Sequence, residues 1–437
     1  MERDSSKSFP EIFKDQYELK GLYRFLNNEK VEISDFIEAY RKGLIDWVLS
    51  QKESSSLYLF QDSTFGKYAG RKVDLGYLET GTDNGVLIHN GILTTSDFEP
   101  LGLGVQQFIQ RERSEYGKKH QRATRPFVEK ESYKWIEGFE FARKFERKTS
   151  RKIIQVCDRE ADIAEVINHA IKYNQGFVIH SSHDRSLRDS ELKISNLINQ
   201  LPVETIAKRP ILDAHGKEHQ LDCQIRFSKV ELEGISKPIY VVNLKQIEEF
   251  PKRKTADNDE PQSLANWTII TNLKVKDAVD AIEVLDIYNR RWRTCEDFHK
   301  CLKTGCQIQE RQLQSPEALL KTIAMLSLVA IQLLRLRHLS ENQALTPIEN
   351  LLSEDEIQVA QIVAQQYLKP IDQTYCKPHT VLWFVLLMAR MGGHQGIKQS
   401  GMPGWQTIWK GLYHFQILVD GFIMSKNFLI QKHPTYG

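Results

Sequence analysis

The chain lacks several features that would place it in a special class of protein. Its six cysteines include no CxxC pair, and their spacing is not that of a secreted disulfide framework. The N-terminus has no apolar segment of the kind found in secretory signal peptides. The most apolar stretch, residues 323–334, is only twelve residues long, too short to cross a bilayer as a helix. We therefore expect a cytoplasmic protein with reduced cysteines and no membrane partner.

An excess of charge of either sign is also lacking. The chain has 59 Lys and Arg against 57 Asp and Glu, and the formal net charge of +2 neither favours nor excludes a polyanionic partner. The distribution is uneven, because residues 111–125 carry six Lys or Arg against two Glu and residues 141–152 carry six against one. Such strips are usually solvated helix faces, although they also attract phosphate backbones.

The length and composition predict a multidomain globular protein. A chain of 437 residues exceeds the usual size of one domain, and 41% hydrophobic residues can form a sizeable core. Short apolar segments predict strands at 57–62, 86–93, 101–108, 151–158 and 176–181. Apolar residues at three- and four-residue spacing predict helices at 17–50, 128–147 and 160–173, and one long helix from 278 to a C-cap at Gly305.

The remaining segments predict a change of architecture along the chain. Residues 182–274 show alternating, turn-separated segments around a polar loop at 251–263, which is typical of a β-rich insertion. Residues 313–435 have a helical pattern, with a final helix after Gly404. The whole order predicts an α/β protein with helical regions at both ends.

Three carboxylates stand at positions that these elements make special. Asp62 ends the first predicted strand, Asp158 ends the strand at 151–158, and Glu296 lies one step around the long helix from its apolar stripe. Each alone is usually a turn former or a helix cap. Together, two strand ends and a helix edge can focus oxygen ligands on one spot, which suits Mg²⁺. Two such ions can promote phosphoryl transfer.

Cationic side chains surround Glu296. Lys303 lies two turns further along the same helix face, and Lys300 lies one turn away. A single Glu and Lys pair at this spacing is usually an exposed ion pair with no role in function. Residues 288–305, however, combine several Lys and Arg with Tyr288 and Trp292, which favours a nucleic acid as the partner.

These residues resemble a known family, the DDE cut-and-paste transposases of bacterial insertion sequences, specifically the IS-four family and its Tn-five transposase branch. The first catalytic Asp of that branch lies in a segment resembling LFQDSTF, which contains Asp62, and the second lies in VCDREADI, which contains Asp158. The third acid lies in a Tyr, Arg, Glu, Lys signature that ends here in EDFHKCLKTG, with Glu296 and Lys303. The similarity runs from about Tyr23 to near the C-terminus and includes EKESYKW, NWTIIT, MARMGGHQG and WQTIWKG.

The resemblance implies a ribonuclease-H-like catalytic core interrupted by a β-rich insertion, plus N-terminal and C-terminal helical regions. The implied units are an N-terminal helical DNA-end-binding remnant at 1–52, the first part of the core at 53–181, the insertion at 182–274, the second part of the core with the catalytic helix at 275–345, and a C-terminal dimerisation region at 346–437.

The resemblance also implies a function. The enzyme would nick transposon ends, form and resolve a hairpin, and join the ends to target DNA, working on double-stranded DNA as a homodimer in a synaptic complex. It would use Mg²⁺, with Mn²⁺ as a possible substitute, in the bacterial cytoplasm and on the nucleoid when bound to DNA. The expected catalytic and metal residues are Asp62, Asp158 and Glu296. The expected DNA-binding residues are Tyr288, Arg291, Lys303, Trp267, Lys300 and Arg24. Trp267 would stack on a flipped base; the alternative, which we favour less, is a core tryptophan.

Two departures from the family pattern lead to further predictions. One extra residue separates Arg291 from Glu296, and five positions on a regular helix turn a side chain about 140° away. We predict a π-bulge between 291 and 296 that restores the direction of Arg291; the alternative is a regular helix on which Arg293 makes the phosphate contact. A further departure is His180, at a strand position where the resemblance implies a basic Arg, so the contact made there would be weaker or pH-dependent.

The second departure concerns the N-terminal end-binding region, which is shorter here than in the family. This predicts an intact catalytic core with an incomplete end-binding unit, in which Arg24 is the best surviving contact. It also leaves a non-catalytic alternative open, a truncated regulator that dimerises with a full-length transposase and inhibits it.

Overall fold

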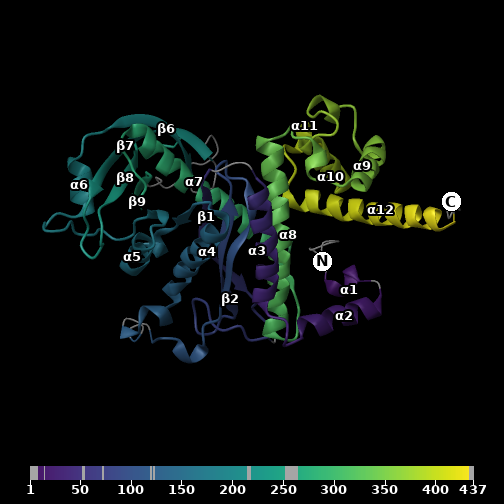
Figure 1. The fold of residues 1–437 in the computed structure, drawn as a ribbon, viewed down its shortest axis with the longest axis horizontal. Helices are drawn as coiled ribbons and strands as arrows, with labels where there is room; N and C mark the ends of the chain where they lie inside the picture. Colours follow the sequence, from purple (N-terminus) through teal and green to yellow (C-terminus); the bar gives the residue numbers. More distant parts are fainter. Residues whose placement is uncertain are drawn as a thin grey trace, which may run out of the picture.

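A computed structural model describes residues 8–13, 15–51, 55–70, 73–118, 121, 124–213, 218–250 and 264–432. Within them, the strands of one mixed sheet are accompanied by helices before, between and after them, which confirms the mixed α/β class (Figure 1). The strands are β1 Leu57–Lys67, β2 Gly85–Thr94, β3 Pro100–Ile109, β4 Ile153–Cys157, β5 Gly176–His180, β6 Thr205–Leu212, β7 Glu218–Val230, β8 Ile239–Gln246 and β9 Asn266–Thr271. The helices are α1 Phe9–Ile12, α2 Gln16–Leu26, α3 Ile33–Ser50, α4 Lys134–Thr149, α5 Ala164–Lys172, α6 Ile194–Gln200, α7 Ala278–Lys300, α8 Pro316–Asn342, α9 Glu354–Tyr367, α10 Val381–Met391, α11 Ile397–Ser400 and α12 Trp405–Lys432.

The strands join into a single sheet in the order β3-β2-β1-β4-β5-β9-β8-β7-β6. β1 is antiparallel to β2 and β2 to β3, whereas β1, β4 and β5 are parallel. The five strands predicted from the apolar segments are therefore confirmed as neighbours. The strands expected as an insertion do not form a separate sheet, because β9 pairs antiparallel with β5 and β8, β7 and β6 continue from it. The polar loop predicted at 251–263 lies outside the described residues.

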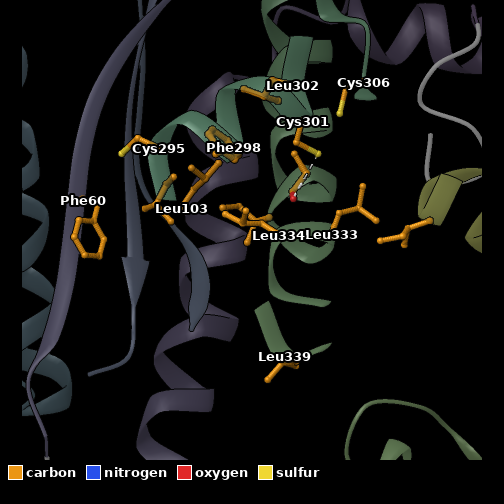
Figure 2. Packing of buried hydrophobic residues seen from close by; sticks show 14 of the residues in the cluster. Phe60, Leu103, Cys295, Phe298, Cys301, Leu302, Cys306, Leu333, Leu334 and Leu339 are labelled. Carbon is orange, nitrogen blue, oxygen red and sulfur yellow. Dashed lines mark hydrogen bonds between the residues drawn. The ribbon is translucent and has the colours of Figure 1, made fainter. Parts of the chain in front are cut away.

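Alternation along the central strands assigns their residues to two faces of the sheet. Phe60 of β1 and Val156 of β4 belong to the hydrophobic cluster that includes α7 and α8. Leu59, the neighbour of Phe60, instead packs in a cluster with residues of α3 and α4. Figure 2 shows the first cluster, with Phe298 of α7 and Leu334 of α8 among its members. Even-numbered residues of β1 and β4 therefore face α7.

The long predicted helix is confirmed as α7, which begins at Asp277. The Asp277 side chain caps the helix by accepting hydrogen bonds from the backbone N–H groups of Val279 and Asp280. The helix is regular to Lys300 and continues as a π-helical turn, Cys301–Gly305. The predicted π-bulge between 291 and 296 is therefore wrong. The predicted end at Gly305 is confirmed as the last residue of the π turn, although the C-cap is Cys306.

The apolar stretch at 323–334 is part of α8, which is long and apolar enough to cross a membrane by length and composition alone, so the expectation that this stretch is too short for a span is wrong. Within its most apolar window, 67% of the residues are buried inside the protein, where α8 packs against β3, α3 and α10. The core helix of a soluble protein has the same length and composition, so this measure does not separate the two cases.

The C-terminal helices α10 and α12 approach each other very closely. A Cβ atom added to Gly411 of α12 would lie 1.6 Å from the Met388 carbonyl oxygen, and one added to Gly392 would lie 1.8 Å from the Thr407 carbonyl oxygen. Both contacts are with backbone atoms. The crossing of these helices therefore depends on glycine at both positions.

Candidate active site

Two of the three expected carboxylates lie side by side on the face of the sheet that α7 covers. The parallel pairing of β1 with β4 places Phe60 opposite Val156. Continuing that register by two residues places Asp62 next to Asp158, on the same face as Phe60 and Val156. Asp158 directly follows β4, as predicted. Asp62 does not end its strand, because β1 continues to Lys67 in a hairpin with β2 beyond the end of β4.

An arginine from α7 is bound to the first of these carboxylates. Arg291 Nη1 donates a hydrogen bond to Asp62 Oδ2 at 2.6 Å. The Asp62 Oδ1 atom accepts a hydrogen bond from the Ser63 backbone N–H at 2.7 Å. The side chains of Arg291 and Asp62 are only 6% and 13% exposed, so water screens this ion pair weakly.

Arg291 reaches the site from a regular helix because it belongs to the buried stripe of α7. Tyr288, Arg291, Cys295 and Phe298 are all buried and follow one another at intervals of three or four residues. Glu296 is next to this stripe and is partly exposed. The stripe, which faces the sheet, therefore sets the direction of Arg291 without a bulge.

Arg293 points to a different part of the surface. Its side chain is 61% exposed and pairs with Glu218 of β7 at 3.3 Å. Of the two arginines left open by the sequence, the structure brings Arg291 to the carboxylates.

The second carboxylate has a perturbed protonation equilibrium. Burial raises the pKa of Asp158 to about 6, the Arg291 charge opposes that shift, and the negative charge of Asp62 adds to it. The Asp158 Oδ1 atom also accepts a hydrogen bond from the Glu160 backbone N–H at 2.9 Å. Two carboxylates beside one cation thus leave Asp158 incompletely stabilised in its charged form.

Glu296 and Lys303 form a second pair of charges near the end of α7. Burial lowers the pKa of the half-buried Lys303, and the nearby Glu296 carboxylate opposes that shift. Lys300 is exposed and interacts with Asp297 rather than with the buried cluster. Among the described residues, no group of three or more His, Cys, Asp or Glu side chains is close enough to hold a metal ion as placed. The structure therefore brings Asp62 next to Asp158 and leaves Glu296 and Lys303 near enough for their charges to interact.

An aromatic cluster of Trp267, Tyr288 and His180 adjoins Arg291. The ring of Trp267 from β9 meets the ring of Tyr288 edge-on, with centroids 6.2 Å apart. The Tyr288 hydroxyl is 3.1 Å from His180 Nδ1 at the end of β5, and the Arg291 guanidinium lies 5.4 Å from the Tyr288 ring centre. Burial, with Arg159 and Arg291, lowers the pKa of His180 to about 4, so the imidazole is neutral at physiological pH.

A chain of buried polar side chains behind Asp62 was not predicted. Gln106 Nε2 donates to Asn90 Oδ1 at 2.9 Å, and Asn90 Nδ2 lies 3.3 Å from His299 Nε2. Burial lowers the pKa of His299 to about 4, with the Asp62 charge opposing. The available signal was the polar pair His89 and Asn90 within an otherwise apolar strand. A buried polar residue needs a partner, so such a pair indicates a polar network.

Arg24 lies apart from this site. It is exposed in the last turn of α2, a helix that packs through Leu26 against Ala318 near the start of α8. In Figure 1, α2 lies on the other side of α8 from α7. The predicted DNA-binding residues therefore fall into two separate groups.

The donor set is suited to a hard divalent cation. Asp62 and Asp158 offer carboxylate oxygens, which Mg²⁺ and Mn²⁺ prefer. The guanidinium of Arg291 shows that a positive charge is already stabilised beside Asp62. Asp62 and Asp158 are thus the residues that could hold a metal. Glu296 lies on α7, the helix that covers them, at the margin of its buried stripe.

No model of a known protein family matches this chain.

Proposed function

We propose that this chain is a DDE-type DNA transposase, a Mg²⁺-dependent DNA nuclease and strand transferase. One observation carries the proposal: Asp62 and Asp158 are neighbours on parallel strands and face the helix that carries Glu296. The strand order β3-β2-β1-β4-β5, with β1, β4 and β5 parallel, supports a ribonuclease-H-like core. The same arrangement supports membership of the IS-four transposase family.

The residues of the chain would divide the work of phosphoryl transfer among them. Bound Mg²⁺ ions would activate the attacking oxygen and stabilise the leaving oxygen. Asp62, Asp158 and Glu296 would hold these ions through their carboxylate oxygens, and the ions would in turn hold the reacting phosphate. Arg291 and Lys303, one on each side of Glu296 along the helix, supply positive charge to the flanking phosphates.

The aromatic cluster of Trp267 and Tyr288 supports the hairpin step. A hairpin requires a base near the cut to leave the stack, and an aromatic platform offsets the lost stacking by about 1–3 kcal/mol. Trp267 is partly exposed on β9 and stands against Tyr288, next to the guanidinium of Arg291. A base on Trp267 would therefore have its phosphate within reach of Arg291.

The C-terminal helix supports action as a homodimer. α12 extends away from the body of the protein in Figure 1. Ile417, Leu418 and Met424 on this helix are 45%, 44% and 73% exposed. Apolar side chains exposed in series on a long helix are a surface suited to a second copy of the chain.

The test is Mg²⁺-dependent nicking of a plasmid that carries the DNA flanking the gene. We expect the wild type to nick it, and Asp62→Asn, Asp158→Asn and Glu296→Gln to reduce nicking to background while DNA binding persists. Glu283→Gln is the matched control, because Glu283 is an exposed carboxylate on the same helix.

Retained nicking in Glu296→Gln would contradict the proposed role of that residue. A wild-type chain that binds DNA and dimerises but never nicks would favour the inhibitory regulator instead. Loss of nicking in Glu283→Gln as well would show that the assay reports the integrity of α7 rather than catalysis.

A further inference from the structure

Arg291 occupies the place where the proposed site needs a metal cation. Its guanidinium is hydrogen-bonded to Asp62 Oδ2 at 2.6 Å, and its charge also acts on Asp158. Guanidinium groups do not deprotonate in proteins, so this positive charge is permanent. A divalent cation that takes Asp62 Oδ2 as a ligand therefore meets a like charge already bound to that oxygen.

The surroundings of Arg291 leave part of its hydrogen-bonding capacity unused. The Arg291 Nε atom is buried and has no hydrogen-bond partner among the described residues. Among the residues that the structure describes, Asp62 is also the only ion-pair partner of Arg291. An arginine released from Asp62 would be a buried charge without a partner, which is strongly unfavourable. It therefore needs another anion before it can leave.

A DNA phosphate has the chemistry that this arginine requires. Phosphate oxygens accept two parallel hydrogen bonds from a guanidinium, so the unpartnered Nε could be used. The centre of the Tyr288 ring lies 5.4 Å from the guanidinium carbon of Arg291, and the same ring contacts Trp267, the proposed platform for the flipped base. A phosphate next to a base stacked on Trp267 would lie on the side of Arg291 away from the carboxylates.

We propose that Arg291 is a resident counter-ion that blocks metal binding at Asp62 until a DNA phosphate draws it away, so that DNA and metal bind cooperatively. This inference rests on the proposed function. By linkage, DNA must strengthen metal binding by the same factor as metal strengthens DNA binding. The ion pair between Arg291 and Asp62 would prevent the nuclease from binding metal until its DNA substrate is bound.

The test measures Mn²⁺ binding by calorimetry on the full chain, with and without a short duplex from the DNA that flanks the gene. Without DNA, we expect Arg291→Gln to bind Mn²⁺ more tightly than the wild type by roughly 5- to 150-fold, the usual range of coupling between two sites. Adding DNA should tighten Mn²⁺ binding by the wild type by a larger factor than that of Arg291→Gln, because only the wild type has an Arg291 charge for the DNA to remove from Asp62. Arg293→Gln, an exposed arginine on the same helix, should behave like the wild type.

A second variant covers the case in which Arg291→Gln fails to fold. Arg291→Lys keeps the charge but lacks the planar fork that holds a phosphate, so it should bind Mn²⁺ weakly both with and without DNA. A Lys variant that responds to DNA as the wild type does would overturn the proposal.

The outcomes separate this inference from the proposed function. Equal Mn²⁺ affinity of the wild type and Arg291→Gln without DNA, together with loss of binding in Asp62→Asn, would overturn the counter-ion role and leave the metal site standing. Absence of Mn²⁺ binding in every variant, with and without DNA, would overturn the metal site itself and with it both proposals.

Discussion

The close approach of α10 and α12 makes Gly411→Ala the most informative test of the C-terminal region. The new Cβ would lie 1.6 Å from the Met388 carbonyl oxygen, whereas contacts below 3.0 Å essentially never occur. The two helices would have to separate by about 1.4 Å, the difference between these two distances. The Met388 carbonyl cannot turn aside freely, because it accepts a hydrogen bond from the Gly392 N–H at 2.9 Å.

The expected loss of stability follows from two opposing terms. Overpacking against fixed atoms costs about 1–3 kcal/mol, and a backbone clash of this size belongs at the upper end. Replacing a helical Gly by Ala gains about 1 kcal/mol. We therefore expect Gly411→Ala to lower the free energy of unfolding by about 2 kcal/mol.

Gly421→Ala is the matched control, because Gly421 is in the same helix and an added Cβ would have nothing within 4 Å. It should raise the free energy of unfolding by up to about 1 kcal/mol. Urea unfolding followed by tryptophan fluorescence, to which the buried Trp409 of α12 contributes, measures both variants. An unfolding midpoint of Gly411→Ala at or above that of Gly421→Ala would refute the close crossing.

The other predictions concern the site and the DNA contacts. Because its folded-state pKa of about 6 exceeds the ordinary 3.8, Asp158 makes the protein less stable as pH rises between these values, and this loss is complete above about pH 6. Asp158→Asn should therefore stabilise the protein by roughly 2–3 kcal/mol at neutral pH and by little near pH 4, as urea midpoints at several pH values would show; a gain independent of pH would contradict this. Trp267→Ala should weaken the extruded state of the flipped base by about 1–3 kcal/mol, measured by fluorescence of 2-aminopurine at that base, and unchanged fluorescence would count against base stacking. Arg24→Ala should weaken DNA binding and reduce the slope of log K against log salt concentration by about 0.9, whereas a change equal to that of the nearby exposed Lys20→Ala would indicate a general charge effect.

Local patterns in the sequence were sufficient to predict the central elements. β1, β4 and β5 were predicted because short apolar runs ended by polar or turn residues indicate buried strands. α7 was predicted because its buried stripe repeats every three or four residues. The position of Asp158 directly after its strand followed from the same reasoning.

The errors came from features that depend on long-range packing. The bulge was predicted by taking Glu296 as the fixed point of the helix, whereas packing of Tyr288, Cys295 and Phe298 fixes it and leaves Glu296 at the margin. Asp62 was taken as a strand end because the polar residues after it interrupt the apolar run. The hairpin with β2 extends β1 through them, since cross-strand hydrogen bonds do not require apolar side chains.

The pairing of β9 with β5 and β8 also limits how the protein can change during evolution. Both edges of β9 are hydrogen-bonded, so Trp267 is positioned by the sheet register and not by a hinge or a linker. An insertion of one residue between Trp267 and Thr271 would move the indole to the opposite face, away from Tyr288. The strands β8, β7 and β6 continue the sheet from β9, so a change of length is tolerated better in the connections between these strands than within β9 itself.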